Sequence, residues 1–66
     1  MERFRTFKRT FWTKSGAPKL GRKTYTGHVN MTFGEANRAC ARMNLEAFGS
    51  ERGRGPRGMA HEFESY

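Results

Sequence analysis

The sequence predicts an α+β domain in which a small antiparallel sheet packs against one α-helix. Residues 3–13 and 20–29 are rich in Thr and aromatic residues, which favour extended strands, and the segment KSGAP between them is typical of a turn. Apolar residues then recur at helical spacing after Thr32. We therefore expect a β-hairpin followed by one helix, with the last residues available for a third, C-terminal strand.

The first predicted strand carries rings on both of its faces. The odd positions are Arg5, Phe7, Arg9 and Phe11, and the even positions are Phe4, Thr6, Lys8, Thr10 and Trp12. Successive side chains of a strand point to opposite faces. We expect one face to pack inward and the other to present aromatic rings to solvent or to a ligand.

The helix has clear start and stop signals. The sequence Thr32-Phe33-Gly34-Glu35 matches a capping box, in which the side chains of the first and fourth residues bind each other's backbone N–H groups. Gly49 is a typical helix stop. The predicted apolar stripe consists of Phe33, Ala36, Cys40, Met43 and Ala47. Because most of these side chains are small, we expect the helix to lie close to the hairpin.

The chain divides into three segments. Residues 1–48 form the predicted basic ββα domain, and residues 49–58 (GSERGRGPRG), with four glycines and one proline, are typical of a flexible linker. Residues 59–66 alternate in character and predict a third strand that sets Glu62 and Glu64 beside the basic first strand. The alternative is a tail that stays loose until something binds it.

The positive charge is concentrated in the first half of the chain. The protein has 66 residues and a net charge of +7. Residues 1–31 contain eight basic residues and only Glu2 as an acid, whereas the basic and acidic residues of 32–66 balance. An excess of charge confined to one region indicates an anionic partner, most often a nucleic acid.

The basic, aromatic hairpin is the candidate binding site. Lys and Arg neutralise phosphates, and aromatic rings stack on bases. The residues predicted to contact phosphates are Arg5, Lys8, Arg9, Arg22 and Lys23, and those predicted to stack are Phe7, Phe11 and Tyr25. The alternative interpretation is that the rings form the core while the cations form a solvated outer face.

The sequence offers little for catalysis or for a metal. The single cysteine, Cys40, excludes an internal disulfide, and its place on the apolar stripe predicts a buried side chain. His28 and His61 lack the spacing of metal ligands. We therefore expect no enzyme, no metal and no cofactor. We also expect no export or membrane segment, and the lone thiol fits a reducing interior.

Four stretches resemble small uncharacterised proteins of tailed bacteriophages. They are FRTFKRTFW, GRKTYTG, TFGEANRAC and the Gly-Pro-linked acidic, aromatic end GPRGMAHEFESY, and they cover roughly residues 4–40 and 55–66. The resemblance implies a phage accessory product in the cytoplasm of a host bacterium, but it implies no established activity.

Two classes of function follow as hypotheses. The first is binding of DNA or RNA through the hairpin, mainly by phosphate contacts. The alternative is a stoichiometric inhibitor or adaptor that docks on a host protein, a ribonucleoprotein or an antiviral defence complex, since Arg and aromatic residues also anchor protein interfaces. A homodimer that stacks rings from two copies is a third possibility.

Overall fold

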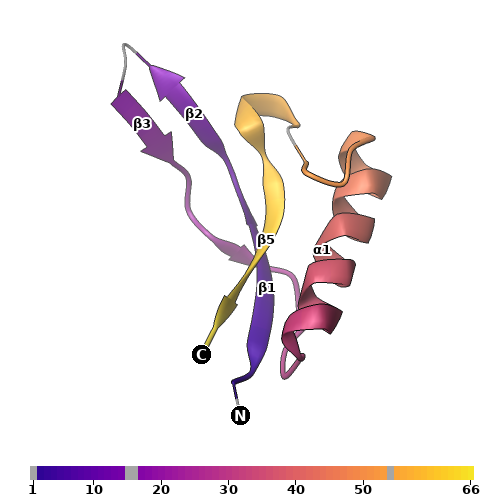
Figure 1. Ribbon diagram of the computed structural model, residues 1–66. Coiled ribbons are helices and arrows are strands. Elements are labelled where there is room, and N and C mark those ends of the chain that lie inside the picture. The colour runs from indigo at the N-terminus through magenta and orange to yellow at the C-terminus, as the bar shows by residue number, and fades with distance from the viewer. Residues whose placement is uncertain (1, 15–16, 54) are drawn as a thin grey trace.

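The computed structural model describes residues 2–14, 17–53 and 55–66, and it confirms the α+β fold (Figure 1). A three-stranded antiparallel sheet has the order β4-β1-β5 and packs against one long helix. The elements of this body are β1 (Phe4–Arg9), β4 (Thr24–Tyr25), α1 (Phe33–Phe48), the 3₁₀ turn η1 (Pro56–Gly58) and β5 (Ala60–Ser65). The predicted third strand at the C-terminus is therefore present.

The predicted hairpin is divided into two parts. Beyond β1, the strands β2 (Phe11–Lys14) and β3 (Ala17–Leu20) form a separate two-stranded sheet, here called the arm. Gly21 N donates to Thr10 O at 2.8 Å and links the arm to the body. The arm projects from the sheet (Figure 1), and the molecule measures 40 × 24 × 16 Å. The side chain of Trp12, expected on the same face of the first strand as Phe4, lies outside the described part.

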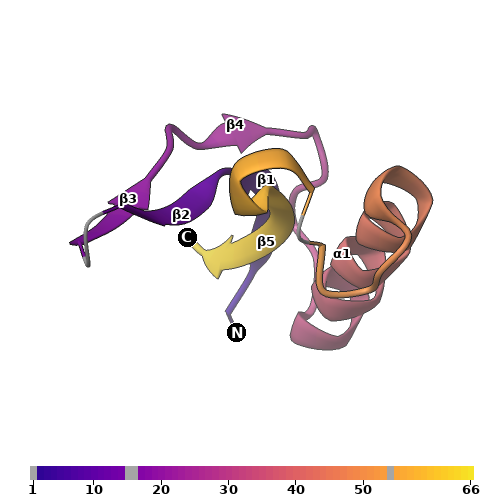
Figure 2. The same cartoon turned by 90° about the horizontal axis from the view of Figure 1, so that it is seen from above.

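Strand β1 is the centre of the body because it pairs along both edges. β5 runs antiparallel to β1 over its full length, from Phe4 opposite Ser65 to Arg9 opposite Ala60. On the other edge, β4 and the segment that follows it complete the pairing, with Thr6 N donating to His28 O at 3.0 Å. Figure 2 shows α1 beside β5 and away from β4. The other edge of β5 is therefore the one that faces α1.

The two faces of the sheet have different surroundings, as the alternation of β1 predicts. On the helix side, Phe4, Phe33 and Phe63 contact one another edge to face, with ring centroids 5.3 to 5.7 Å apart. Thr6 is buried on the same side, and its hydroxyl bonds that of Thr26. The opposite face, here called the open face, carries the odd-numbered residues of β1.

The predicted helix signals are confirmed at both ends of α1. Thr32 N donates to Glu35 Oε1 at 2.8 Å, and Glu35 N donates to Thr32 Oγ1 at 3.2 Å. Gly49 adopts the left-handed conformation with φ of 74° and ends the helix. No helix in residues 2–14, 17–53 or 55–66 is long and apolar enough to cross a membrane.

The buried stripe of α1 differs from the predicted one. The buried residues are Ala36, Cys40 and Asn44, whereas Ala47 is exposed and Phe33 remains 59% exposed. Cys40 is buried as expected. The helix is rotated relative to the predicted stripe because Asn44, although polar, finds hydrogen-bond partners beside β5.

The connection between α1 and β5, predicted as a flexible linker, makes close contacts with the rest of the molecule. A Cβ on Gly53 would lie 2.5 Å from Ala60 Cβ, and one on Gly55 would overlap the ring of Phe48. A Cβ on Gly58 would overlap the backbone of Phe11. The glycines of this segment therefore allow close packing against the helix, β5 and the arm.

Candidate nucleic-acid interface

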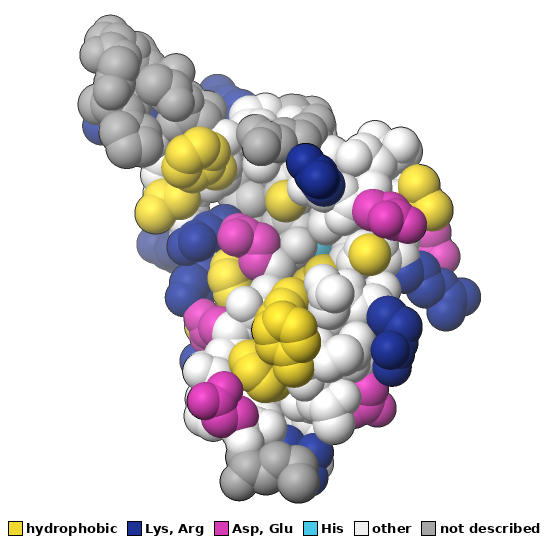
Figure 3. Space-filling view, in the orientation of Figure 1, with side chains coloured by type: hydrophobic (Ala, Val, Ile, Leu, Met, Phe, Trp, Pro, Cys, Tyr) yellow, Lys and Arg dark blue, Asp and Glu magenta, His cyan; other side chains and the backbone are white. Residues whose placement is uncertain are grey.

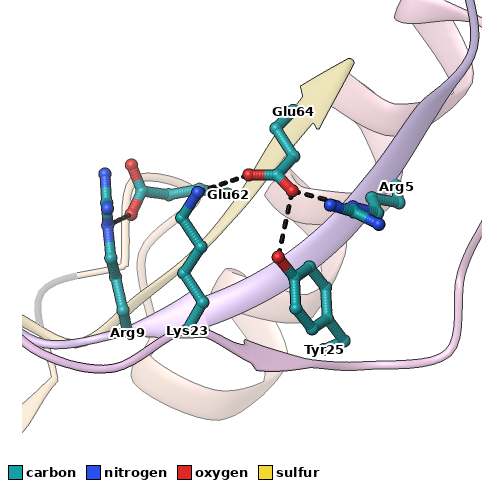
Figure 4. A network of polar contacts seen from close by, with 6 residues as sticks. All are labelled: Arg5, Arg9, Lys23, Tyr25, Glu62 and Glu64. Atoms are coloured by element: carbon teal, nitrogen blue, oxygen red, sulfur yellow. Dashed lines mark hydrogen bonds and ion pairs between the residues drawn. The ribbon is translucent and has the colours of Figure 1, made fainter. Parts of the chain in front are cut away.

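Glu64 of β5 lies at the centre of a polar network on the open face (Figure 4). Its carboxylate accepts hydrogen bonds from Arg5 Nε at 2.7 Å, from Lys23 Nζ and from the Tyr25 hydroxyl at 3.1 Å. The hydrogen bonds from Lys23 and Arg5 lower the pKa of Glu64 from 4.5 to about 2. In return, the hydrogen bond to Glu64 raises the pKa of Arg5.

Glu62 forms the second ion pair of this face. Its Oε2 accepts from Arg9 Nε at 2.9 Å. Together the two pairs confirm the expectation that the C-terminal glutamates lie beside the basic first strand. Three of the five predicted phosphate contacts, Arg5, Arg9 and Lys23, already bind a carboxylate of the same chain.

Aromatic rings lie beneath these cations. Phe7 is only 3% exposed, and Lys23 Nζ and Arg9 Cζ lie 4.8 and 5.3 Å from the centroid of its ring. Arg5 Cζ lies 4.6 Å from the ring of Tyr25. A ring in such a layer is stabilised by the cation above it. Phe7 is thus covered and its ring is not available to stack on a base.

The remaining predicted site residues lie apart from one another. Lys8 belongs to the helix-side set of β1, is half-buried and lies opposite His61. Arg22 is exposed in the segment after the arm, and Phe11 and Tyr25 are 43% and 51% exposed. The structure therefore does not gather the eight predicted residues into one surface.

The distribution of charge now favours the arm over the open face. Three cations and two carboxylates leave the network with a net charge of +1. Residues 3–34 contain no acidic residue, so Lys14, Lys19 and Arg22 have no acid near them in the sequence. Within the described part of the chain, the exposed Lys19 and Arg22 form no ion pair.

A groove of about 480 Å³ lies between the base of the arm, β5 and α1. Phe11 and Leu20 line it from the arm, Asn37 and Ala41 from α1, and Arg52 from the loop after the helix. Figure 3 views the molecule in the same orientation as Figure 1 and shows hydrophobic side chains at the base of the arm, beside basic and acidic ones. This groove could not be predicted from the sequence, because its walls come from three segments that are distant along the chain.

Burial disfavours the charged forms of two groups that line the groove, Cys40 and His61. Burial raises the pKa of the Cys40 thiol to about 11, with Glu62 adding to the shift. Burial also lowers the pKa of His61, and the charges of Lys8 and His28 lower it further. Among residues 2–14, 17–53 and 55–66, no three His, Cys, Asp or Glu side chains gather as they would around a metal ion.

Comparisons with known proteins found no matching family model, no matching curated protein and no matching solved structure. The resemblance to proteins of tailed bacteriophages therefore stays a prediction from the sequence.

Proposed function

We propose that this protein binds DNA or RNA, mainly through phosphate contacts, with the basic arm and the segment after it as the principal contact surface. The observation that carries the proposal is the lack of any acid in residues 3–34, together with two exposed cations, Lys19 and Arg22, that have no ion-pair partner among the described residues. A phosphate can bind these side chains without first displacing a carboxylate.

The shape of the arm supports the same proposal. The arm is a projecting two-stranded ribbon, and the major groove of duplex DNA admits an element of this kind. The arm leaves the body of the protein at Thr10 and Gly21, so its two strands can approach a ligand without the helix. The proposed contacts of Lys19 and Arg22 are to phosphates, which position a protein on its ligand but carry no sequence information, so we expect low sequence specificity.

The open face makes a smaller contribution in this proposal. Arg5, Arg9 and Lys23 would have to exchange Glu62 or Glu64 for a phosphate. Such an exchange gains little, because one charge-assisted hydrogen bond replaces another. The arm and the open face therefore differ in how strongly replacement of their cations should weaken binding.

The salt dependence of binding tests the proposal. For duplex DNA the slope of log affinity against log salt is about −0.9 for each phosphate neutralised. Replacing Lys19 and Arg22 together by Ala should make the slope less steep by about 0.9 for each phosphate that the variant no longer neutralises. The measurement is fluorescence anisotropy of a labelled duplex over a series of salt concentrations.

A matched control removes two arginines from α1. The variant Arg38→Ala with Arg42→Ala lowers the net charge by the same amount, at exposed positions on the helix. We expect it to leave the slope nearly unchanged. Equal effects of the two double variants would show that only total charge matters, and the arm would then not be the interface. Absence of any binding to duplex or single strand would refute the proposal as a whole.

A second candidate function, docking on another protein, is favoured by Phe33. This side chain is 59% exposed although it contacts the rings of Phe4 and Phe63. Exposed aromatic residues backed by other rings are typical anchors of protein interfaces. A partner that is retained from lysate after nuclease treatment, and that Phe33→Ala no longer retains, would favour this candidate over nucleic-acid binding.

A further inference from the structure

The groove between the arm, β5 and α1 has the size and lining of a small-ligand site. Its volume of about 480 Å³ falls within the range of about 300–1,000 Å³ that such sites occupy. Apolar side chains of Phe11 and Leu20 form one wall. These two residues are paired across the arm and remain 43% and 59% exposed.

The ionisable groups of the groove balance one another. The lining contains two cations, Arg9 and Arg52, and two carboxylates, Glu51 and Glu62. A phosphate gains little from a balanced lining, whereas an uncharged planar group can contact the apolar wall and form hydrogen bonds with the polar side chains. Asn37 offers its amide for this purpose, because it is exposed and bonds no other residue of the described part.

The surroundings of the groove are nevertheless basic. Besides the lining residues, Lys19 directly precedes Leu20 in the sequence and Arg22 follows it by two residues, and both are exposed. A ligand that combines an uncharged planar ring with neighbouring negative charges matches this arrangement. A nucleotide within a polynucleotide chain has those features, since its base is neutral and a phosphate lies on each side of it.

We infer that this groove binds an unpaired base of single-stranded nucleic acid, with the base stacked against the ring of Phe11. The inference rests on the proposed function and specifies its ligand. In a duplex the faces of the bases are covered by their neighbours, and exposing one base costs a few kcal/mol. A groove that uses the face of a base therefore selects single strands over duplexes.

Stacking and phosphate contact leave different signatures in binding measurements. Base stacking on an aromatic side chain contributes about 1–3 kcal/mol for each base, which is roughly a 5- to 150-fold change in affinity. It releases no counterions, so removing it should leave the salt slope unchanged. Removing a phosphate contact lowers the affinity and makes the slope less steep at the same time.

The experiment measures binding of wild-type protein and variants to a labelled oligothymidylate and to a duplex of the same length, over one series of salt concentrations. We expect the wild type to bind the single strand more tightly than the duplex. Phe11→Ala should weaken binding to the single strand by roughly 5- to 150-fold at an unchanged slope. Phe11→Tyr, which keeps the ring, should retain the affinity.

Val29→Ala is the matched control, because Val29 is also 59% exposed but does not line the groove. Equal or tighter binding of the duplex, or unchanged single-strand affinity of Phe11→Ala, overturns the inference and leaves phosphate binding by the arm intact. Failure to bind either oligonucleotide refutes the proposed function as well.

Thymidine monophosphate tests whether the ligand is a free nucleotide instead. It carries the same base and one phosphate, but it lacks the second flanking phosphate and the rest of the chain. We expect it to displace the oligonucleotide only at much higher nucleotide concentration. Displacement at equal nucleotide concentration would identify a mononucleotide site and overturn the inference.

Discussion

The side-chain amide of Asn44 binds both backbone polar groups of His61. Its Oδ1 accepts from His61 N at 2.6 Å, and its Nδ2 donates to His61 O at 3.1 Å. Nδ2 also donates to Glu51 O at 3.1 Å, so one residue of α1 joins β5 to the loop after the helix. β5 is an edge strand, and its unpaired backbone groups could pair with another chain. By binding the backbone of His61, Asn44 occupies this edge at one position.

Replacing Asn44 should therefore destabilise the fold. Asn44 is 3% exposed, and Asn44→Ala removes the hydrogen-bond partners of the N–H and C=O of His61, which costs about 1–3 kcal/mol for each group left unsatisfied. The free energy of unfolding, measured by urea denaturation, should fall by at least that amount. Asn37→Ala is the control, because Asn37 is exposed on the same helix, and its effect should stay within about 0.5 kcal/mol. Similar losses in the two variants would contradict this role of Asn44.

Glu64 should make the stability depend on pH in the acidic range. Its pKa is about 2 in the folded protein, against 4.5 as its ordinary value, since Lys23 and Arg5 bind the ionised form. The stabilisation of the folded state by ionised Glu64 is fully present above about pH 4.5. It is lost as the pH falls towards 2, because Glu64 takes up a proton in the unfolded chain at a higher pH than in the folded protein. Thermal unfolding of the wild type should show this loss, and Glu64→Gln should show less of it.

The control for this prediction is Glu46→Gln. Glu46 pairs with Arg42 at 3.3 Å on the exposed surface of α1, where both side chains are more than half exposed. Exposed pairs of this kind contribute little to stability. An equal change in the pH profile of both variants would show that the Glu64 network has no particular role.

Gly58 should tolerate no side chain. Its φ of 70° favours glycine, and an added Cβ would overlap the carbonyl oxygen of Phe11 at the base of the arm. Gly27→Ala is a matched control with φ of 90° and no atom within 4 Å, so it carries backbone strain of about 1–3 kcal/mol without overlap. Urea denaturation should show a larger loss of stability for Gly58→Ala, and a smaller or equal loss would argue against close contact between η1 and the arm.

Cys40 should react slowly while the protein is folded. The thiol is 5% exposed and its pKa of about 11 leaves very little thiolate at about pH 8. Incubation with iodoacetamide, followed by mass spectrometry, should show little labelling of the native protein and rapid labelling in urea. Rapid labelling under native conditions would mean that α1 separates readily from β5.

The elements themselves could be predicted because their signals are local. The capping box of Thr32 and Glu35 lies within one turn, and Gly49 ends the helix through its own backbone conformation. Alternation along β1 correctly separated a helix-side face from an open face. The apolar stripe was less well predicted, because apolar periodicity does not include a polar residue such as Asn44, whose burial depends on partners 7 and 17 residues away.

The candidate site was predicted in part. The basic, aromatic first strand is evident from composition, and placing Glu62 and Glu64 beside it followed from the expected third strand. Which cation binds which carboxylate could not be read from the sequence, since Arg5 and Glu64 are 59 residues apart. The separation of the arm from the body was also missed, because the break at Thr10 depends on how β5 and η1 pack beside the hairpin.

The sequence by itself determined the class of elements, the limits of the helix and the excess of positive charge in residues 1–31, because these depend on neighbouring residues or on composition alone. Only the tertiary structure decided which charges remain available to a ligand. Pairing of β5 with β1 brings Glu62 and Glu64 within hydrogen-bond distance of Arg9 and Arg5. Electrostatic compensation depends on distance in space, and the fold sets that distance.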